Sequence, residues 1–250
     1  MINQNLKYLF IVLLPLMLGA CKKETASVPT DEEILGTIVK PAKTGEYIYP
    51  IQPGTPEWAT LGSHDEMIDA TQIPDLVLDT ISTWGLLESC LKYPLYGDFS
   101  AFNNEVSYIN DLVQSNHGFK ELLSREDAPQ VMLYFYRHWD ITLYPNFLKR
   151  NFIEFILGSD GFISKLNGRQ QLYLISVALD KKQKQEAAYQ GSIPPYSYYV
   201  MANAMIHYGY NPFIEYCATE KPTLPDGYFY WRINSSYEKI EEYSRALLNL

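Results

Sequence analysis

Residues that usually identify a chemistry are scarce in this chain. Its 250 residues include only three cysteines and four histidines. The histidines show neither a His-Glu-x-x-His pair nor another zinc-ligand spacing. Their positions are His64, His117, His138 and His207. The sequence also lacks a Gly-rich phosphate loop and a Gly-x-Ser-x-Gly motif around a nucleophilic serine. It therefore predicts no metal site, no cofactor and no recognisable catalytic residue.

Positive charge is in short supply as well. The chain has 20 Lys and Arg against 29 Asp and Glu, for a formal net charge of −9, and no long basic run. Proteins that bind nucleic acid neutralise phosphates with clustered Lys and Arg. The charge balance therefore argues against nucleic acid as a partner. It also argues against electrostatic docking on anionic lipid.

Long hydrophobic runs are limited to one near the start, Leu9–Leu18. This run is too short to span a bilayer, which needs about 20 apolar residues, but it suits the core of a signal peptide. It ends in Leu18-Gly19-Ala20-Cys21. The segment resembles the bacterial lipoprotein signal, in which the cysteine thiol takes a diacylglycerol and the chain is cut just before it. A secretory signal with a chance cysteine is the alternative.

The lipoprotein interpretation divides the chain into three parts. Residues 1–20 are the expected signal peptide, with lipidation at Cys21. Residues 21–45 are polar and contain prolines and glycines, and we expect a flexible tether there. Residues 46–250 are expected to form a single domain. The expected location is the cell envelope, with the membrane engaged through the N-terminal lipid and the periplasmic face favoured over the cell surface.

The two remaining cysteines, Cys90 and Cys217, each lie in an apolar, helix-like context. A periplasmic location would allow them to form a disulfide. Two separate buried thiols are favoured, because free cysteine behaves as a small hydrophobe.

Short stretches with helical periodicity, separated by Pro and Gly, cover the rest of the chain. Ser63 lies where one N-cap is expected, and either Ser82 or Thr83 lies where a second is expected. Leu172–Leu179 is the most apolar helix, and Lys181-Lys182-Gln183-Lys184 is predicted to be its solvated end. Alternating strand and helix patterns are absent. The predicted fold is all-α, with short antiparallel helices in a globular or irregular solenoid-like array.

One block of the sequence resembles uncharacterised exported proteins and lipoproteins of Bacteroidetes. The block covers about residues 47–125, and the resemblance implies an exported helical protein without a known activity. Its matching segments are Tyr49-Pro50-Ile51-Gln52-Pro53-Gly54-Thr55-Pro56-Glu57-Trp58, Met67, Ile73-Pro74, Ser82-Thr83-Trp84-Gly85-Leu86, Tyr93-Pro94-Leu95-Tyr96-Gly97-Asp98 and Ala101-Phe102-Asn103.

Aromatic residues are abundant, with 21 Tyr, 11 Phe and 4 Trp. Two Tyr-rich segments would form a platform for a glycan or peptide if they lie together. Their candidate residues are Tyr196, Tyr198, Tyr199, Tyr228, Tyr230 and Trp231. Ordinary core packing is the competing interpretation.

Three functions are compatible with these observations, the third being a purely structural role. The first is a non-enzymatic binding module in the envelope, for a protein or a glycan. It agrees with the anchor, the aromatic content and the lack of catalytic motifs. The alternative is an envelope hydrolase that uses carboxylates in a helical cleft. Two acids with coupled, raised pKa values would favour the alternative.

Overall fold

The computed structural model describes residues 27–143, 146–189, 196–220 and 236–250. Within these ranges every regular element is a helix and no strand occurs, which confirms the predicted all-α fold. The first half contains α1 (Asp31–Leu35), the 3-10 helix η1 (Trp58–Thr60), α2 (His64–Ala70), α3 (Asp75–Leu78), α4 (Thr83–Leu91), η2 (Asp98–Ala101), α5 (Glu105–Ser115), α6 (His117–Ser124) and α7 (Ala128–His138). The second half contains η3 (Ile141–Leu143), α8 (Phe147–Gly158), α9 (Asp160–Ile163), α10 (Gly168–Ala188), α11 (Ser197–Tyr208), α12 (Asn211–Glu220) and α14 (Tyr237–Leu248).

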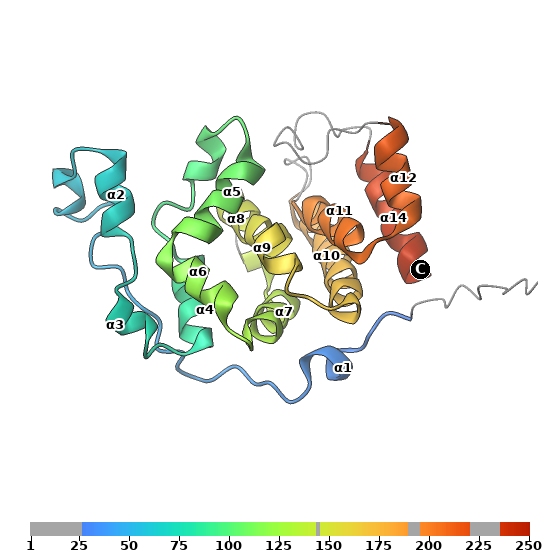
Figure 1. Ribbon diagram of the computed structural model, residues 1–250, viewed down its shortest axis with the longest axis horizontal. Helices are drawn as coiled ribbons and strands as arrows, with labels where there is room; N and C mark the ends of the chain where they lie inside the picture. Colours follow the sequence, from blue (N-terminus) through green and yellow to red (C-terminus); the bar gives the residue numbers. More distant parts are fainter. Residues whose placement is uncertain (1–26, 144–145, 190–195, 221–235) are drawn as a thin grey trace, which may run out of the picture.

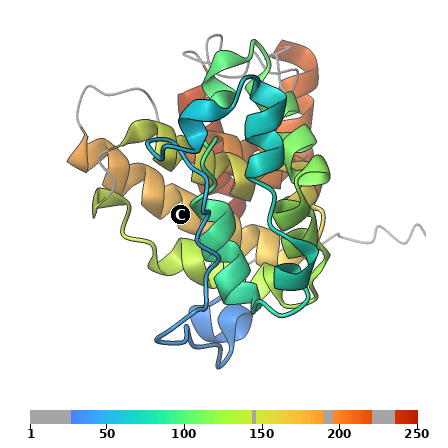
Figure 2. The ribbon, with the colours of Figure 1, turned by 90° about the vertical axis from the view of Figure 1, so that its left-hand side faces the viewer.

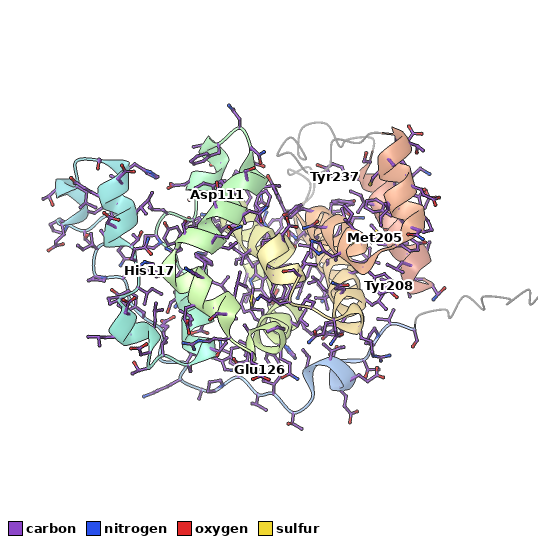
Figure 3. The ribbon with its side chains drawn as sticks, viewed as in Figure 1. Asp111, His117, Glu126, Met205, Tyr208 and Tyr237 are labelled. Carbon is purple, nitrogen blue, oxygen red and sulfur yellow. The ribbon has the colours of Figure 1, made fainter. Side chains whose placement is uncertain are left out.

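The helices follow one another along the long axis of the molecule in roughly chain order, from α2 and α3 on the left of Figure 1 to α12 and α14 on the right. The exception is α1, which lies below the array and packs against α7 and α10. A hydrophobic core extends along this axis. Side chains fill the space between the helices, where Met205 is fully buried, whereas Asp111 and Glu126 lie exposed on the outside (Figure 3).

Local capping explains why two helices begin at the predicted residues. At the start of α2, the Ser63 hydroxyl accepts a hydrogen bond from the backbone N–H of Glu66. Ser82 accepts from the backbone N–H of Gly85 at the start of α4 in the same way. The first turn of a helix leaves its N–H groups without helical partners, so these hydroxyls stabilise both starts.

The N-terminal segment differs from the expectation of a flexible tether over residues 21–45. Residues Asp31–Leu35 of this segment form α1, which packs against α7 and α10. Thr30 and Glu33 form a capping box at the start of α1, which buries Ile34 and Leu35. The Tyr173 hydroxyl of α10 donates to Asp31 at 2.8 Å. The overall polarity of this segment concealed the adjacent Ile34 and Leu35, which hold the short helix on the core together with the polar contacts of Asp31 and Glu33.

After α1, residues 36–47 run alongside α4, and we call this segment the strap (Figure 2). The Ser82 hydroxyl donates to the backbone carbonyl of Thr44 at 2.9 Å. The backbone N–H of Tyr47 donates to the Ser89 hydroxyl at 2.8 Å. Gly85 lets the strap approach closely, because a Cβ at this position would lie 2.6 Å from the Thr44 carbonyl oxygen.

The predicted solvated end of the apolar helix is wrong for Lys181 and Lys182, whereas Gln183 and Lys184 are exposed as predicted. Helix α10 continues to Ala188, and Lys181 and Lys182 are 2% and 7% exposed. The Lys181 ammonium donates to the backbone carbonyls of Arg137 and Trp139, at the end of α7. Carbonyls at a helix C-terminus lack helical donors and carry partial negative charge, which accounts for a buried cation there.

Candidate functional site

The predicted aromatic platform is not exposed where the structure describes it. Tyr196, Tyr198 and Tyr199 of α11 and its N-cap are only 3–6% exposed. The Tyr196 hydroxyl donates to Glu105 at 2.7 Å, and the Tyr199 ring packs 5.3 Å from the Phe155 ring, measured between centroids. These rings are core residues and cannot present a face to a glycan. The other predicted positions, Cys21, Tyr228, Tyr230 and Trp231, lie outside the described residues.

Cys90 and Cys217 are both free thiols, as the sequence favoured. Cys90 is buried, and this burial raises the pKa of its thiol well above the ordinary value. Cys217 is half-buried, and burial raises the pKa of its thiol to about 11. A thiol reacts as the thiolate, so a raised pKa leaves both groups unreactive near neutral pH.

The histidines lie in four separate environments. Three of them contact a carboxylate: His64 meets Asp98 at 2.7 Å, His117 meets Asp75 at 3.8 Å, and His207 meets Asp160 at 3.0 Å. The fourth, His138, contacts the backbone carbonyl of Tyr134 at 2.9 Å. Among the described residues, no group of three or more His, Cys, Asp or Glu is arranged to hold a metal ion.

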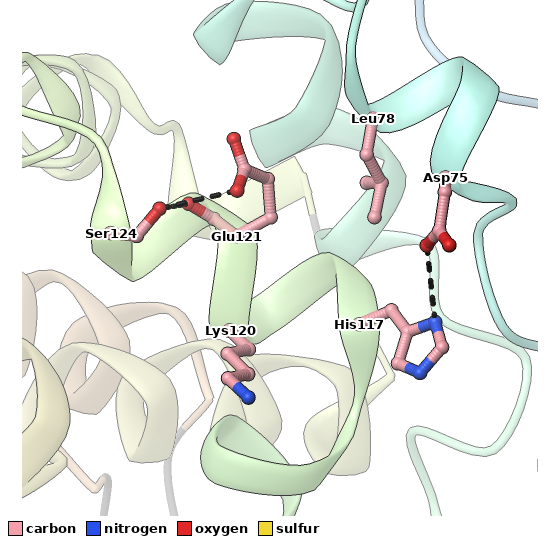
Figure 4. A pocket seen from close by; sticks show the side chains of 6 residues that line it. All are labelled: Asp75, Leu78, His117, Lys120, Glu121 and Ser124. Carbon is pink, nitrogen blue, oxygen red and sulfur yellow. Dashed lines mark hydrogen bonds and ion pairs between the residues drawn. The ribbon is translucent and has the colours of Figure 1, made fainter.

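An open groove between α3 and α6 is the first cavity with polar walls (Figure 4). Its volume is about 380 Å³, and its walls include His117, Asp75, Glu121 and Ser124. The Ser124 hydroxyl donates to the backbone carbonyl and the carboxylate of Glu121, at 2.7 and 3.2 Å, and it does not bond to His117. The His117 and Asp75 side chains are 54% and 87% exposed. A nucleophilic triad needs a hydroxyl bonded to the histidine, and Ser124 does not make this bond, so the groove lacks the arrangement of a triad. Water also screens the charges of the two exposed side chains.

A buried carboxyl group provides the second polar cluster. Glu154 of α8 is fully buried and accepts hydrogen bonds from the Tyr136 hydroxyl at 2.9 Å, from Gln185 at 3.1 Å and from Ser197. Burial raises the pKa of Glu154, and these hydrogen bonds only partly offset the effect. The cluster joins α7, α8, α10 and the start of α11, so it connects helices inside the core.

A third site, which we call the lysine pocket, lies between α4, α7, α8 and the strap. This cavity has a volume of about 270 Å³. Its apolar walls are Leu91, Phe135 and Ile153. Its charged walls are Lys40, Glu88, Lys92 and Lys149. Three ammonium groups around one cavity are unusual in a chain whose net charge is −9.

Two of these lysines already have a carboxylate partner. Lys40 of the strap pairs with Glu88, which also accepts a hydrogen bond from the Thr44 hydroxyl. Burial alone would raise the pKa of Glu88, but the bonds from Lys40 and Thr44 hold it below its usual range, so the carboxylate is ionised. Lys92 pairs with Glu46, which also belongs to the strap. Each pair is close to electrically neutral.

Lys149 differs from the other two lysines. Its ammonium group donates to the backbone carbonyl of Leu91 and lies 4.3 Å from the centroid of the Tyr96 ring. No ion pair joins it to a carboxylate in the part of the chain that the structure describes. Burial, together with the positive charge of Lys92, lowers the pKa of Lys149 to about 8. An ammonium has three N–H donors, and the Leu91 carbonyl occupies one of them.

The sequence analysis missed all three lysines of the pocket, although one signal was present. Lys149 precedes Phe152, Ile153 and Ile156 by three, four and seven residues, and all three are buried. Residues with this spacing share one face of a helix. A lysine on an otherwise apolar face indicates a cation held at the edge of the core.

Comparisons with known proteins found nothing similar to this chain, whether among protein-family models, curated proteins or solved structures. The resemblance to Bacteroidetes lipoproteins therefore stays a prediction. Within the described residues, no helix combines the length and the apolar character that crossing a bilayer requires.

Proposed function

We propose that this protein is a lipid-anchored, non-enzymatic binding module of the bacterial envelope, whose ligand presents a negatively charged group to the lysine pocket. The lysine pocket is the observation that carries the proposal. It combines apolar walls with a few convergent polar groups, as ligand sites usually do. Lys149, which no carboxylate neutralises among the described residues, supplies the attraction.

The charge distribution supports an anionic ligand. The pocket holds three ammonium groups and one carboxylate, so it carries a local excess of positive charge. A cation that is partly removed from water interacts more strongly with an anion than an exposed surface lysine does. Lys149 meets this condition, because it is half-buried and contacts the Tyr96 ring.

A hydrolase with paired carboxylates has less support among the described residues. Glu105 and Glu154 both have a raised pKa, but each owes it to its own burial and not to the other carboxyl group. Neither residue lines the groove or the lysine pocket. A hydrolytic pair needs two carboxyl groups facing one substrate. We therefore favour binding over hydrolysis.

Lysine footprinting of the full chain tests the pocket. An amine-reactive reagent would be applied with and without inorganic phosphate or acetate, and modification would be read by mass spectrometry. We expect acetate to protect Lys149 and Lys92, and phosphate to protect them at higher concentration, while Lys165, which is exposed on another part of the surface, reacts as before. Equal protection of all lysines would overturn the proposal.

The envelope anchor has a separate test. Cells that express the chain would be given a fatty acid with an alkyne tag. We expect the wild type to incorporate the label and to sediment with membranes, because acyl chains contribute about 0.8 kcal/mol per buried methylene. The Cys21→Ser variant should lose both properties. A labelled Cys21→Ser variant would contradict lipidation at this residue.

A further inference from the structure

We infer that the lysine pocket selects a small monocarboxylate with a compact apolar body, whose carboxylate bonds to the Lys149 ammonium while its body packs on Leu91, Phe135 and Ile153. This inference rests on the proposed function and adds the chemical class of the ligand. Three features of the pocket carry it: its charge balance, its walls and the helix end that it meets.

The charge balance favours a single negative charge. Lys40 and Lys92 each have a carboxylate partner, Glu88 and Glu46, while Lys149 has none among the described residues. One carboxylate on Lys149 therefore completes the neutralisation of the pocket. A dianion would leave one charge in a partly enclosed cavity, and an unpaired charge out of water is costly.

The walls favour an apolar body of small size. Leu91 and Ile153 are 7% and 1% exposed and Phe135 is half-buried, so the apolar side chains that line the cavity belong to the core and do not form an exposed patch. The volume of about 270 Å³ lies just below the range of about 300–1,000 Å³ that is usual for drug-sized ligands. Burying apolar ligand surface on these walls contributes affinity without any further polar contact.

The backbone at the pocket disfavours a phosphate group. Helix α4 ends at Leu91, so the negative end of its dipole lies at the pocket and opposes a phosphate dianion more strongly than a carboxylate with a single charge. No arginine is among the pocket's lining residues, although Arg is the side chain that best matches phosphate with two parallel hydrogen bonds. A monocarboxylate needs only the one ammonium that is present.

Methyl NMR of the full chain, as isolated from the cells that make it, tests the ligand class. The probes are benzoate, benzamide and inorganic phosphate. Compared with benzoate, benzamide has the same apolar ring but no negative charge. Phosphate has negative charge but no apolar ring. We expect benzoate to shift the Ile153 and Leu91 methyl signals and to leave Ile240 of α14 unchanged. Benzamide and phosphate should each bind at least tenfold more weakly.

Two variants test whether benzoate binds to the Lys149 ammonium. Lys149→Met keeps a side chain of similar length and should weaken benzoate binding at least tenfold. Lys181→Met is the matched control, because Lys181 also caps a helix end but does not line the pocket. It should bind benzoate within twofold of the wild type. The wild-type methyl shifts test the site even if Lys149→Met does not fold.

The outcomes separate the ligand class from the proposed function. Phosphate binding that equals or exceeds benzoate binding overturns the monocarboxylate inference and leaves an anion pocket in place. Equal binding of benzamide and benzoate overturns the role of the Lys149 charge. If none of the three probes shifts the Ile153 signal, both the inference and the proposed function are wrong.

Discussion

Lys149 and Lys181 both donate hydrogen bonds to backbone carbonyls at the C-terminal end of a helix. Lys149 reaches the Leu91 carbonyl at the end of α4, and Lys181 reaches the Arg137 and Trp139 carbonyls at the end of α7. Burial lowers the pKa of each ammonium to about 8. The difference is access, because Lys149 is half-buried and lines a cavity, while Lys181 is 2% exposed.

A lowered lysine pKa can belong to a structural site or to a ligand site, and Lys181 and Lys149 differ in this respect. Structural sites and functional sites both shift pKa values, so the shift alone does not identify a ligand site. The Lys181 ammonium donates its hydrogen bonds to two backbone carbonyls inside the protein. Lys149 donates to one carbonyl and lines the lysine pocket, where the proposed ligand would meet its remaining donors. Substitutions at the two positions should therefore affect different properties: stability at Lys181 and anion binding at Lys149.

The largest expected effect is the loss of stability in Lys181→Met. The substitution leaves the Arg137 and Trp139 carbonyls without their donor in a place that water reaches poorly. We expect the free energy of unfolding to fall by about 2–3 kcal/mol, as measured by urea denaturation. Lys184→Met is the control on the same helix, because Lys184 forms an exposed ion pair with Asp180. Its change should stay below about 0.5 kcal/mol. Similar losses in both variants would contradict the capping role of Lys181.

The pH dependence of stability should show the buried charge directly. The pKa of Lys181 is about 8 in the folded protein and 10.5 ordinarily, so between these values the unfolded chain binds more protons. The contribution of Lys181 to the free energy of unfolding therefore rises with pH in this window. The difference between wild type and Lys181→Met should grow by about 1–2 kcal/mol from about pH 7.5 to about pH 9.5. A constant difference would show that the ammonium is hydrated.

Helix starts were predictable from the sequence because they depend on neighbours within one turn. Ser63 and Ser82 bond to backbone N–H groups three residues ahead, and both caps are present in the structure. The all-α fold followed from the same local periodicity. Leu172–Leu179 was also correctly predicted as helix, although α10 extends well past its predicted end at the lysines.

The lysine pocket depends on contacts between distant parts of the chain. Lys149 bonds to a carbonyl 58 residues away, and Lys181 to carbonyls 44 and 42 residues away. Composition cannot show which cations meet a helix end after folding. The same limit applies to tyrosine, since Tyr196 and Tyr198 bond to carboxylates that only the tertiary structure brings to them.

The third expected effect is a smaller loss of stability in Lys149→Met. This substitution leaves only the Leu91 carbonyl without its donor, and the pocket lets water take its place. We expect a loss of about 1 kcal/mol in the free energy of unfolding, half or less of the loss in Lys181→Met. Urea denaturation of both variants in one buffer gives the comparison. A larger loss in Lys149→Met would mean that Lys149 is the more structural of the two lysines.

The smallest expected effect is that of Lys40→Met. Lys40 lies on the strap, its side chain is 46% exposed, and the Glu88 carboxylate that it pairs with keeps a hydrogen bond from Thr44. An exposed ion pair contributes about 0–1 kcal/mol, so the stability should change by less than about 0.5 kcal/mol.

The loss of Lys40 should nevertheless weaken anion binding, because it leaves the charge of Glu88 without its cation beside the pocket. We expect benzoate affinity to fall about two- to threefold at low salt, and the difference from wild type to shrink as added salt screens the exposed charge. Titrations at two salt concentrations measure both changes. If Lys40→Met lost as much benzoate affinity as Lys149→Met, the anion would be held by the pocket's lysines together and not by Lys149 alone.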